Sequence, residues 1–411
     1  MKILHVNKFL YRRGGAEGYL FDVAALQRAA GHEVAFFGMS HPENEPMPYA
    51  RSFPRRIEFD PVPSDVRGKV EGVGRMLWSS SARRGIDEVL EAFRPDVVHL
   101  HNVYHQLSPS ILWPLRRRRI ASVMTLHDYK LACPTYRFLD GGEICEACLP
   151  RRLWQPVVRA CNAGSRGASA AVAAELGLHT LLGAYRPVGL FLCPSRFLEG
   201  KMRQAHVFPE RLRWVPNFVD VDRWHAHDEP GRGVVFAGRL SDEKGADVLI
   251  RAMAHLPDAT LDLAGDGPAR PDLEALATAE GISERVRFRG RLSADALGSL
   301  LRGAAVSVVP SRWYENQPLA VLEAFASGLP VVGTDLGGIP ELIDPGVDGT
   351  RVPANDPVAL AEALRPLLDD PALAFRMGAA ARAKAERDFG PARHLERITA
   401  AYDEAIAGMA A

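Results

Sequence analysis

The chain alternates short apolar runs with longer segments in which apolar residues recur every three or four positions. Short apolar runs that end at Gly, Pro or polar residues are typical of buried parallel strands, and the longer pattern is typical of amphipathic helices. At the start of the chain, Ile3–Val6 is predicted as a strand, Ala16–Ala30 as a helix and His32–Gly38 as a second strand. This β-α-β beginning predicts a doubly wound α/β sheet.

The same alternation continues along the chain. Helices are predicted at Ala168–Tyr185 and Arg196–Gln204, and Ser195 is suited to cap the second of them. Residues 41–84 are rich in Pro, Arg and Gly and lack a clear period, so we expect an irregular insertion there. Because 411 residues are too many for one hydrophobic core, we expect two domains. The remaining predicted strands are Asp96–His101, Ser122–Leu126, Leu190–Pro194, Val234–Ala237, Leu261–Ala264, Val286–Arg291, Ala304–Val309 and Leu329–Thr334.

The stretch Pro310–Leu342 places polar residues where a predicted strand ends. Glu315 lies in the loop after Ala304–Val309, Glu323 lies in the helix that follows, and the glycine-rich turn Leu336–Pro340 lets backbone approach a ligand closely. Free N–H groups at the start of such a helix favour anions. Two carboxylates can be ordinary surface charges, but ligands of open α/β sheets lie beyond the carboxyl ends of the strands. We therefore expect a binding site here.

This stretch reads Pro-Ser-Arg-Trp-Tyr-Glu-Asn-Gln-Pro-Leu-Ala-Val-Leu-Glu, and it resembles the Glu-x7-Glu signature of retaining glycosyltransferases of family four, the group 1 glycosyltransferases. The resemblance implies the GT-B architecture, in which two Rossmann-like doubly wound domains face each other across a cleft. We accordingly expect an acceptor-binding domain at residues 1–190 and a nucleotide-sugar-binding domain at residues 191–386. Residues 387–411 are expected to return to the first domain, and Val215–Asp220 resembles the family's interdomain connector.

The resemblance also implies a reaction. A sugar would move from a UDP- or GDP-linked donor to the hydroxyl of a carbohydrate or lipid-linked acceptor, with retention of configuration and without a metal or other cofactor. Such transferases act in the assembly of bacterial polysaccharide, lipopolysaccharide or glycolipid. In the loop Gly238–Gly245, Arg239 and Lys244 are two cations that can bind one diphosphate, the first as a planar fork and the second as a point charge. The same Gly-Arg-Leu-x5-Gly phrase marks the family's diphosphate site.

Further site residues follow from the resemblance. Glu323 would accept hydrogen bonds from the ribose hydroxyls, and Glu315 would bind hydroxyls of the donor sugar. His127 follows the predicted strand Ser122–Leu126 and would contact the donor sugar beside the scissile bond, although a buried structural His also fits this position. The predicted catalytic residues are His127, Arg239, Lys244 and Glu315. The other residues expected to bind the donor are Gly14, Gly15, Arg291, Asn316, Gln317, Pro318, Leu319 and Glu323.

Charge is unevenly distributed, although the formal net charge is zero. Residues 1–185 carry 24 Lys and Arg against 18 Asp and Glu, whereas residues 186–411 carry 26 against 32. The first half contains the run Arg116–Arg119, which either ends a helix in solvent or binds phosphates, so this half is a candidate for contact with an anionic membrane or acceptor. With no apolar run of membrane-spanning length and no signal peptide, we expect a cytoplasmic protein, free or at the inner face of the cell membrane.

Four of the five cysteines have the spacing C-x11-C-x2-C-x12-C. Four thiolates can bind a tetrahedral structural zinc ion, but reduced cysteines without a ligand fit the pattern equally well, and a cytosolic setting argues against disulfides. His99 and His101 share one face of a strand, which favours an active-site edge over a metal site. The four candidate zinc ligands are Cys133, Cys145, Cys148 and Cys161.

Other classes of function fit the sequence less well. The chain has neither a Walker phosphate loop nor a G-x-G-x-x-G that opens a helix, and we expect no nucleic acid partner. A nucleotide-sugar epimerase would share the fold but not the Glu-x7-Glu signature. A non-catalytic interaction protein of transferase descent remains an alternative, although such a protein would not need these motif residues.

Overall fold

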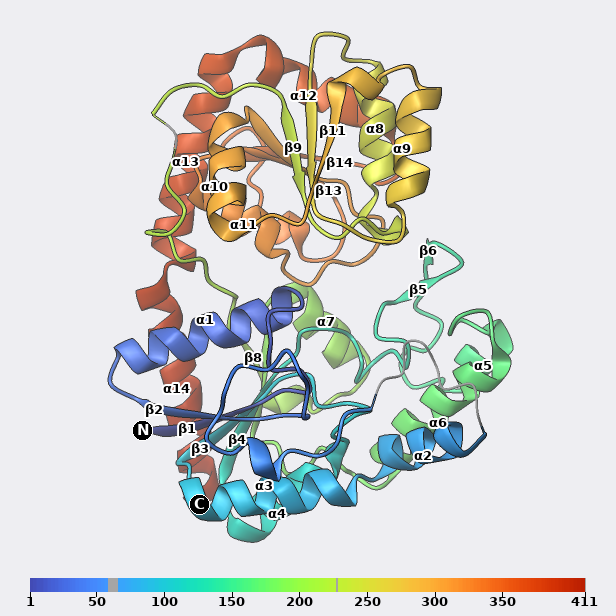
Figure 1. The fold of residues 1–411 in the computed structure, drawn as a ribbon, viewed down its shortest axis with the longest axis vertical. Helices are drawn as coiled ribbons and strands as arrows, with labels where there is room; N and C mark the ends of the chain where they lie inside the picture. Colours follow the sequence, from blue (N-terminus) through green and yellow to red (C-terminus); the bar gives the residue numbers. More distant parts are fainter. Residues whose placement is uncertain (58–65, 227, 411) are drawn as a thin grey trace.

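The computed structural model describes residues 1–57, 66–226 and 228–410, and it shows two α/β domains, one above the other in Figure 1. Each domain contains one six-stranded parallel sheet. The strand order is β2-β1-β3-β4-β7-β8 in the first sheet and β11-β10-β9-β12-β13-β14 in the second. In both sheets the order reverses beside the first strand of the domain, which is the doubly wound arrangement. The predicted fold class is confirmed.

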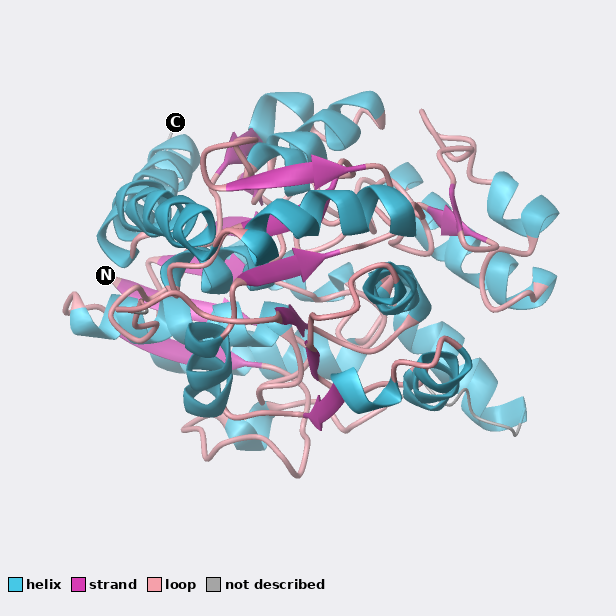
Figure 2. Ribbon diagram, turned by 90° about the horizontal axis from the view of Figure 1, so that it is seen from above, coloured by secondary structure: helices cyan, strands magenta, loops and turns pink. Residues whose placement is uncertain are grey.

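The strands are short and almost wholly apolar because helices cover both faces of each sheet (Figure 2). The first sheet contains β1 (Lys2–Val6), β2 (Glu33–Phe37), β3 (Val97–Leu100), β4 (Ala121–Thr125), β7 (Leu190–Cys193) and β8 (Leu212–Trp214). The second contains β9 (Val234–Ala237), β10 (Leu261–Ala264), β11 (Val286–Gly290), β12 (Val306–Val309), β13 (Val331–Thr334) and β14 (Gly349–Val352). An antiparallel pair outside both sheets consists of β5 (Leu139–Asp140) and β6 (Glu143–Ile144).

The helices bury one side against these sheets. In the first domain, alternate residues of β1 face opposite layers: Leu4 packs with α3, and Ile3 packs with α1 and α14. The helices of the first half are α1 (Gly15–Ala29), α2 (Val66–Leu77), α3 (Ser80–Phe93), α4 (Leu112–Arg118), α5 (Gln155–Arg159), α6 (Arg166–Leu181) and α7 (Arg196–Gln204). Those of the second half are α8 (Ala246–Ala254), α9 (Arg270–Ala279), α10 (Ala294–Gly303), α11 (Leu319–Ala326), α12 (Pro357–Asp369), α13 (Pro371–Phe389) and α14 (Pro391–Ala410). Within the described part of the chain, every helix is too short or too polar to cross a lipid bilayer.

Part of the segment 41–84, residues 58–65, lies outside the described residues, and for much of the rest the prediction of an irregular insertion is wrong. It contains α2 and the first turn of α3, and Ser79 caps α3 by accepting a hydrogen bond from the amide of Ala82. Gly85, directly after this segment, lies inside α3. A Cβ there would come 1.9 Å from the carbonyl oxygen of Ser52, so close packing explains this glycine.

The chain leaves the first sheet after Trp214 and enters the second at Val234. A domain boundary at residue 190 would therefore separate β7 and β8 from the sheet to which they belong. The C-terminal helix α14, red in Figure 1, runs back beside the first domain. Its residues Ile398 and Tyr402 are buried against that sheet.

Candidate functional site

Two loops meet at the switch point of the second sheet, where the strand order reverses between β9 and β12. Residues 238–245 follow β9, and residues 310–318 follow β12. Gly245 ends the first loop with φ +69°, and a Cβ there would come 2.0 Å from the carbonyl oxygen of Pro310. The loops are therefore in contact, and they form the sheet edge at which open α/β domains bind ligands.

Glu315 holds a buried carboxylate in the second loop. Its Oε1 accepts hydrogen bonds from Nζ of Lys244 at 2.6 Å and from the hydroxyl of Ser311 at 2.6 Å. Burial acts to raise the pKa of Glu315, but attraction to Lys244 and these hydrogen bonds outweigh burial, so the pKa lies below its ordinary value. Glu315 is therefore an anion, and its counterion is one of the two cations predicted to bind a diphosphate.

The two predicted diphosphate cations have different surroundings. Besides contacting Glu315, Lys244 lies 5.4 Å from the centroid of the Trp313 ring. Arg239 is exposed, and no hydrogen bond or ion pair to its guanidinium occurs among the described residues. Arg291, directly after β11, is exposed as well. Arg239 is thus available to an anionic ligand without displacing a carboxylate of the protein.

The glycine-rich turn Leu336–Pro340 packs against the Glu315 loop. A Cβ at Gly338 would come 1.7 Å from the carbonyl oxygen of Asn316. Gly337 has φ +64°, and a Cβ there would come 2.4 Å from the carbonyl oxygen of Glu315, which also accepts the Gly338 amide at 2.7 Å. The sequence suggested that this turn approaches a ligand. In the structure its close approach is to the loop that carries Glu315, and it fixes the backbone of that loop.

Glu323 lies on α11 and is half-buried. A charged residue of the first domain, Asp22, is close enough to affect its carboxyl group. Burial raises the pKa of Glu323 to about 7, and the negative charge of Asp22 on α1 adds to this effect while Arg223 opposes it. The carboxyl group is therefore divided between its neutral and ionised forms near neutral pH. A group that titrates in this range within a cleft is a functional candidate.

The N-termini of α1 and α11 lie close to each other. Gly14 is the extended N-cap of α1, and Pro318 is the N-cap of α11. A Cβ at Gly15, the first residue of α1, would come 3.5 Å from Cδ1 of Leu319, the first residue of α11. Each N-terminus carries backbone N–H groups without intrahelical partners, so the two together favour an anion.

The polar residues after Glu315 contact the first domain. Asn316 donates from Nδ2 to the carbonyl oxygen of Leu126 at 2.8 Å and accepts at Oδ1 from the hydroxyl of Ser195 at 2.9 Å. Gln317 accepts at Oε1 from the amide of Asn217 at 2.5 Å. Predicted donor-binding residues are thus engaged in holding the two domains together.

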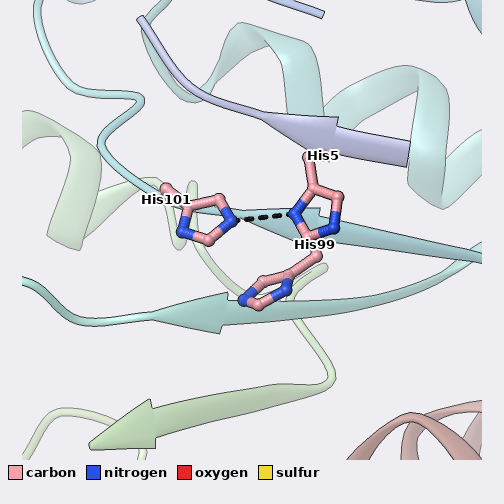
Figure 3. Close-up of side chains that lie close together, drawn as sticks. All are labelled: His5, His99 and His101. Atoms are coloured by element: carbon pink, nitrogen blue, oxygen red, sulfur yellow. Dashed lines mark hydrogen bonds between the residues drawn. The ribbon is translucent and has the colours of Figure 1, made fainter. Parts of the chain in front are cut away.

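His127 follows β4, directly after the carbonyl that Asn316 binds, and it begins a row of imidazoles. Its Nε2 is 2.9 Å from Nδ1 of His101, whose Nε2 is 3.0 Å from Nδ1 of His5 (Figure 3). Burial lowers the pKa of His127 and of His5 to about 4 and holds the pKa of His101 well below its ordinary value. These three side chains are therefore neutral at neutral pH.

Within the described ranges, one group of three side chains lies close enough to share a metal ion, with ligand atoms within 4.8 Å of one another. It consists of His5, His99 and His101. Their ring nitrogens already have hydrogen-bond partners, and the bond between His5 and His101 requires a proton where a shared metal would bind. The geometry therefore favours a hydrogen-bonded row over a metal centre. The outer partners are Gln27, Tyr402 and Thr125.

Two family models match the chain: residues 13–223 match Glycosyltransferase Family 4, and residues 221–384 match Glycosyl transferases group 1. The chain belongs to the group 1 glycosyltransferases. The chain is 37% identical over 226 residues to D-inositol 3-phosphate glycosyltransferase 1 of Catenulispora acidiphila, a match that covers 49% of this chain and 53% of the relative. It is 38% identical over 160 residues to the alpha-D-kanosaminyltransferase of Streptomyces kanamyceticus, over 38% of this chain and 41% of the relative. The chain thus spans about half the length, or less, of these curated relatives.

Solved structures resemble nearly the whole of this chain. Sucrose-phosphate synthase from Thermosynechococcus elongatus has a TM-score of 0.75 at 21% identity and matches 99% of both chains. HepE of Anabaena in complex with UDP has a TM-score of 0.69 at 19% identity, over 98% of this chain and 100% of its own. At such identities the likeness shows the fold, and the predicted GT-B architecture is confirmed.

The sequence did not indicate several residues that hold the candidate site together. Tyr129 donates to the carbonyl oxygen of Glu315 at 3.3 Å. Glu341, from the second domain, accepts the backbone amides of Arg196 and Phe197 at the start of α7 at 2.7 and 2.5 Å. Tyr129 lies two residues after the predicted site residue His127, but nothing in the local pattern distinguishes Glu341 from a surface carboxylate.

The predicted zinc ligands gather in one region but are less tightly grouped than the histidines. All are free cysteines, and the thiols of Cys133 and Cys148 are close enough to shift each other's pKa. The neighbouring Cys148 lowers the pKa of Cys133 to about 6, and Cys133 together with burial raises the pKa of Cys148. Cys145 and Cys161 are close enough to influence Cys148 electrostatically. Within the described residues, these thiols do not form a group of three within 4.8 Å.

Proposed function

We propose that this protein transfers a sugar from a nucleoside-diphosphate sugar to an acceptor hydroxyl, with retention of the anomeric configuration and by chemistry that needs no metal. The observation that carries the proposal is the pair of cations on the loop after β9, directly at the switch point of the second sheet. Arg239 has no carboxylate partner among the described residues, and Lys244 is held by Glu315. This arrangement suits a ligand that brings its own negative charge.

The cations would act on the leaving group. Negative charge builds on the diphosphate as its bond to the sugar breaks, and fixed cations stabilise that charge. Arg239 would bind the diphosphate directly, and Lys244 would bridge the diphosphate and the Glu315 carboxylate. The opposed N-termini of α1 and α11, with Gly14 and Gly15 at the first of them, add N–H groups of the right polarity.

The carboxylates and His127 would hold the sugar parts of the donor. Glu323, when ionised, can accept two hydrogen bonds from the ribose diol, and backbone near Arg291 would face the base. Glu315 and the segment Asn316–Leu319 would bind hydroxyls of the transferred sugar, and His127 would contact that sugar from the first domain. The short distance between His127 and the Glu315 loop, bridged by the Asn316–Leu126 bond, supports this pairing of the two domains.

The donor and acceptor are proposed as classes. A UDP-linked sugar is the first donor to test, because the HepE structure of the same fold contains UDP, and a GDP-linked sugar is the second. The acceptor would be a carbohydrate or a lipid-linked intermediate in the assembly of bacterial polysaccharide, lipopolysaccharide or glycolipid. The curated relatives, with names as different as inositol-phosphate glycosyltransferase and kanosaminyltransferase, do not narrow that class.

A turnover assay tests the function. The protein is incubated with UDP- and GDP-sugars, with and without acceptor extracts, and the products are separated. Acceptor-dependent release of the nucleoside diphosphate with a new glycoside of unchanged configuration supports the proposal. Interconversion of two nucleotide sugars would instead identify an epimerase. If the protein shows no turnover, and if the donor does not raise its Tm, a non-catalytic interaction protein remains as the interpretation.

We further propose that Cys133, Cys145, Cys148 and Cys161 bind one structural zinc ion that fixes the long segment after His127. The Cys133–Cys148 contact and the lowered pKa of Cys133 support a site that can deprotonate for a metal. The thiols would have to move closer together when the ion binds. Elemental analysis of protein purified without added metal is expected to give about one zinc per chain. Four titratable thiols in the folded, metal-free protein would contradict this proposal.

Contact with a membrane is proposed through the first domain. Arg117 and Arg118 of the Arg116–Arg119 run pair with Asp87 on α3 at 2.7 Å, so part of this charge is neutralised. Apolar side chains provide a second means of attachment. An exposed group, here called the apolar patch, lies on α5, on the end of α6 and after α2, and α5 and α2 both pack against α6. Its members are Trp78, Trp154, Val158, Leu181 and Leu182, the last two 82% and 69% exposed.

A further inference from the structure

A row of hydrogen bonds leads from His127 at the site to the C-terminal helix. Beyond His101 and His5, the row continues from Nε2 of His5 to Oε1 of Gln27 on α1, at 2.7 Å. The amide nitrogen of Gln27 then donates to the hydroxyl of Tyr402 on α14, at 2.8 Å. His101, His5, Gln27 and Tyr402 are all fully buried, so bulk water does not compete for these bonds.

The Gln27 amide fixes the direction of the hydrogen bonds, because its oxygen can only accept and its nitrogen can only donate. In the structure the oxygen faces Nε2 of His5 and the nitrogen faces the hydroxyl of Tyr402.

The nitrogen side of the Gln27 amide sets the direction toward His99. The oxygen of Tyr402 accepts from Gln27, so Tyr402 donates its own hydrogen to Nδ1 of His99, 2.8 Å away. His99 is neutral because burial holds its pKa well below its ordinary value, so its proton is on Nε2, which donates to the hydroxyl of Thr125 at 2.7 Å.

From Gln27 the same reasoning reaches the site. The amide oxygen of Gln27 can only accept, so His5 carries its proton on Nε2 and accepts at Nδ1 from His101. A neutral imidazole has one N–H, so His101 accepts at Nδ1 from Nε2 of His127. His127 is left with a lone pair on Nδ1, which has no hydrogen-bond partner among the described residues.

We propose that Gln27 and Tyr402 are positioning residues that hold His127 as its Nε2–H tautomer, with Nδ1 offered as an acceptor to a hydroxyl of the donor sugar. Both residues are fully buried, so they act through the row and not by touching a substrate. The role of Nδ1 toward the sugar rests on the proposed glycosyl transfer. The tautomer of His127 follows from the hydrogen bonds alone and is measured separately.

The tautomer is read from long-range ¹H–¹⁵N correlation spectra of protein labelled with ¹⁵N-histidine, because protonated and bare ring nitrogens resonate apart. The signals of His127 are assigned by their loss in His127→Asn. At pH 7 the wild-type protein is expected to show His127 with its proton on Nε2. A proton on Nδ1 of His127 in the wild-type protein would overturn the inference.

Two substitutions of Gln27 are expected to differ in their effect on the tautomer of His127: one changes it and the other keeps it. Gln27→Met would leave an Nε2–H of His5 buried without a partner, which is rarely tolerated, so the row would reverse and His127 would carry its proton on Nδ1. Its kcat is expected to fall about tenfold, as for the loss of one hydrogen bond, with little change in the KM of the donor. Gln27→Glu keeps an acceptor for His5, so His127 stays Nε2–H. Its carboxylate also accepts from Tyr402, so His99 moves its proton to Nδ1.

The matched control is Gln106→Met, which removes another buried amide of the first domain whose Oε1 has no hydrogen-bond partner. It is expected to leave every histidine tautomer unchanged. Equal losses of kcat in Gln27→Met and Gln27→Glu, with the tautomer of His127 unchanged in both, would show a merely structural role and contradict the inference. If the wild-type protein transfers no sugar, the proposed function fails, and the spectra still decide the tautomer.

Discussion

Arg239 and Lys244 lie on one loop but are expected to respond differently to removal. Arg239→Ala should lower kcat by about 10²–10³ at saturating donor, because a fixed cation on the leaving group is lost. It should leave Tm unchanged, because among the described residues the side chain has no hydrogen bond or ion pair to lose. Lys244→Ala should lower kcat similarly and also destabilise the fold by about 1–3 kcal/mol, because it leaves the buried Glu315 carboxylate without its cation. Steady-state kinetics and thermal melts measure both effects. Full activity in the double variant would exclude this role for the cations.

The carboxyl group of Glu323 makes the free energy of unfolding depend on pH. Its folded pKa of about 7 exceeds the ordinary value of 4.5, so the folded state binds the proton more tightly. The neutral form therefore stabilises the fold below about pH 4.5, and this contribution is lost as the pH rises to about 7. Glu323→Gln does not lose this contribution. The Tm of Glu323→Gln minus the wild-type Tm should therefore rise between about pH 4.5 and pH 7 and stay constant above that range.

The same substitution should weaken binding of the nucleoside diphosphate at pH 8, where the wild-type carboxylate accepts two hydrogen bonds from the ribose. Calorimetry of UDP binding measures this effect. Glu362→Gln, which changes an exposed carboxylate, is the control and should alter neither quantity. A difference in Tm between Glu323→Gln and the wild type that does not vary with pH would contradict the assignment.

For single residues, the sequence predicted which side chains lie at the site better than it predicted the groups that surround them. Glu315, Glu323, Arg239 and Lys244 stood out because their loops follow strands, and the structure places these loops at one switch point. Lys244 pairs with Glu315 across 71 positions, and the pKa of Glu323 depends on Asp22 from the other domain. Such relations arise only when the sheets assemble, so no local pattern contains them.

Among the elements, strands were predicted best because each is a short apolar run that ends sharply. Val234–Ala237 and Leu261–Ala264 form with the predicted bounds, and Arg196–Gln204 forms as a helix capped by Ser195, as predicted. The sequence missed α2 because its Gly and Arg content is typical of a loop. Whether such a segment forms a helix depends mainly on its packing against the rest of the protein and not on helix propensity alone.

Helix α7 joins the domains through its N-terminus, where a carboxylate complements the partial positive charge. Glu341→Gln removes that charge and one of the two oxygens that accept the amides of Arg196 and Phe197. Charge-assisted bonds contribute about 1.5–3 kcal/mol, so the equilibrium between closed and open domains should shift toward open by roughly tenfold or more. Small-angle X-ray scattering should then show a larger radius of gyration.

Glu280→Gln is the control for this experiment, because Glu280 pairs with Arg251 inside the second domain and does not bridge the domains. It should leave the radius of gyration unchanged. If Glu341→Gln scatters like the wild-type protein, these contacts do not hold the domains closed.

At the scale of the whole molecule, the first domain carries both the basic excess and the apolar patch. Sedimentation with anionic vesicles should show binding that weakens with salt, because exposed charges are screened, and each basic residue near the surface contributes about 1 kcal/mol. Changing Leu181 and Leu182 to Ser should weaken binding at every salt concentration, because apolar contacts are not screened. Changing Arg116–Arg119 to Ser should remove mainly the salt-dependent part.

A matched control comes from the other domain, where Val347 and Val358 are also exposed apolar side chains. Changing both to Ser should leave vesicle binding as it was. Equal binding of the wild-type protein to neutral and anionic vesicles would contradict the electrostatic part of the proposal.

The return of α14 to the first domain has a consequence for biosynthesis. When the ribosome has completed β8, the first sheet has all its strands but lacks the helix that covers Ile3, Val97 and Val123. At about 5–20 residues per second, roughly 10–35 s of translation of the second domain must pass before α14 emerges. During that time the nascent chain exposes an apolar sheet face to chaperones, and Tyr402 has not yet joined the imidazole row. A nascent chain therefore cannot set the tautomer of His127 until its last helix docks.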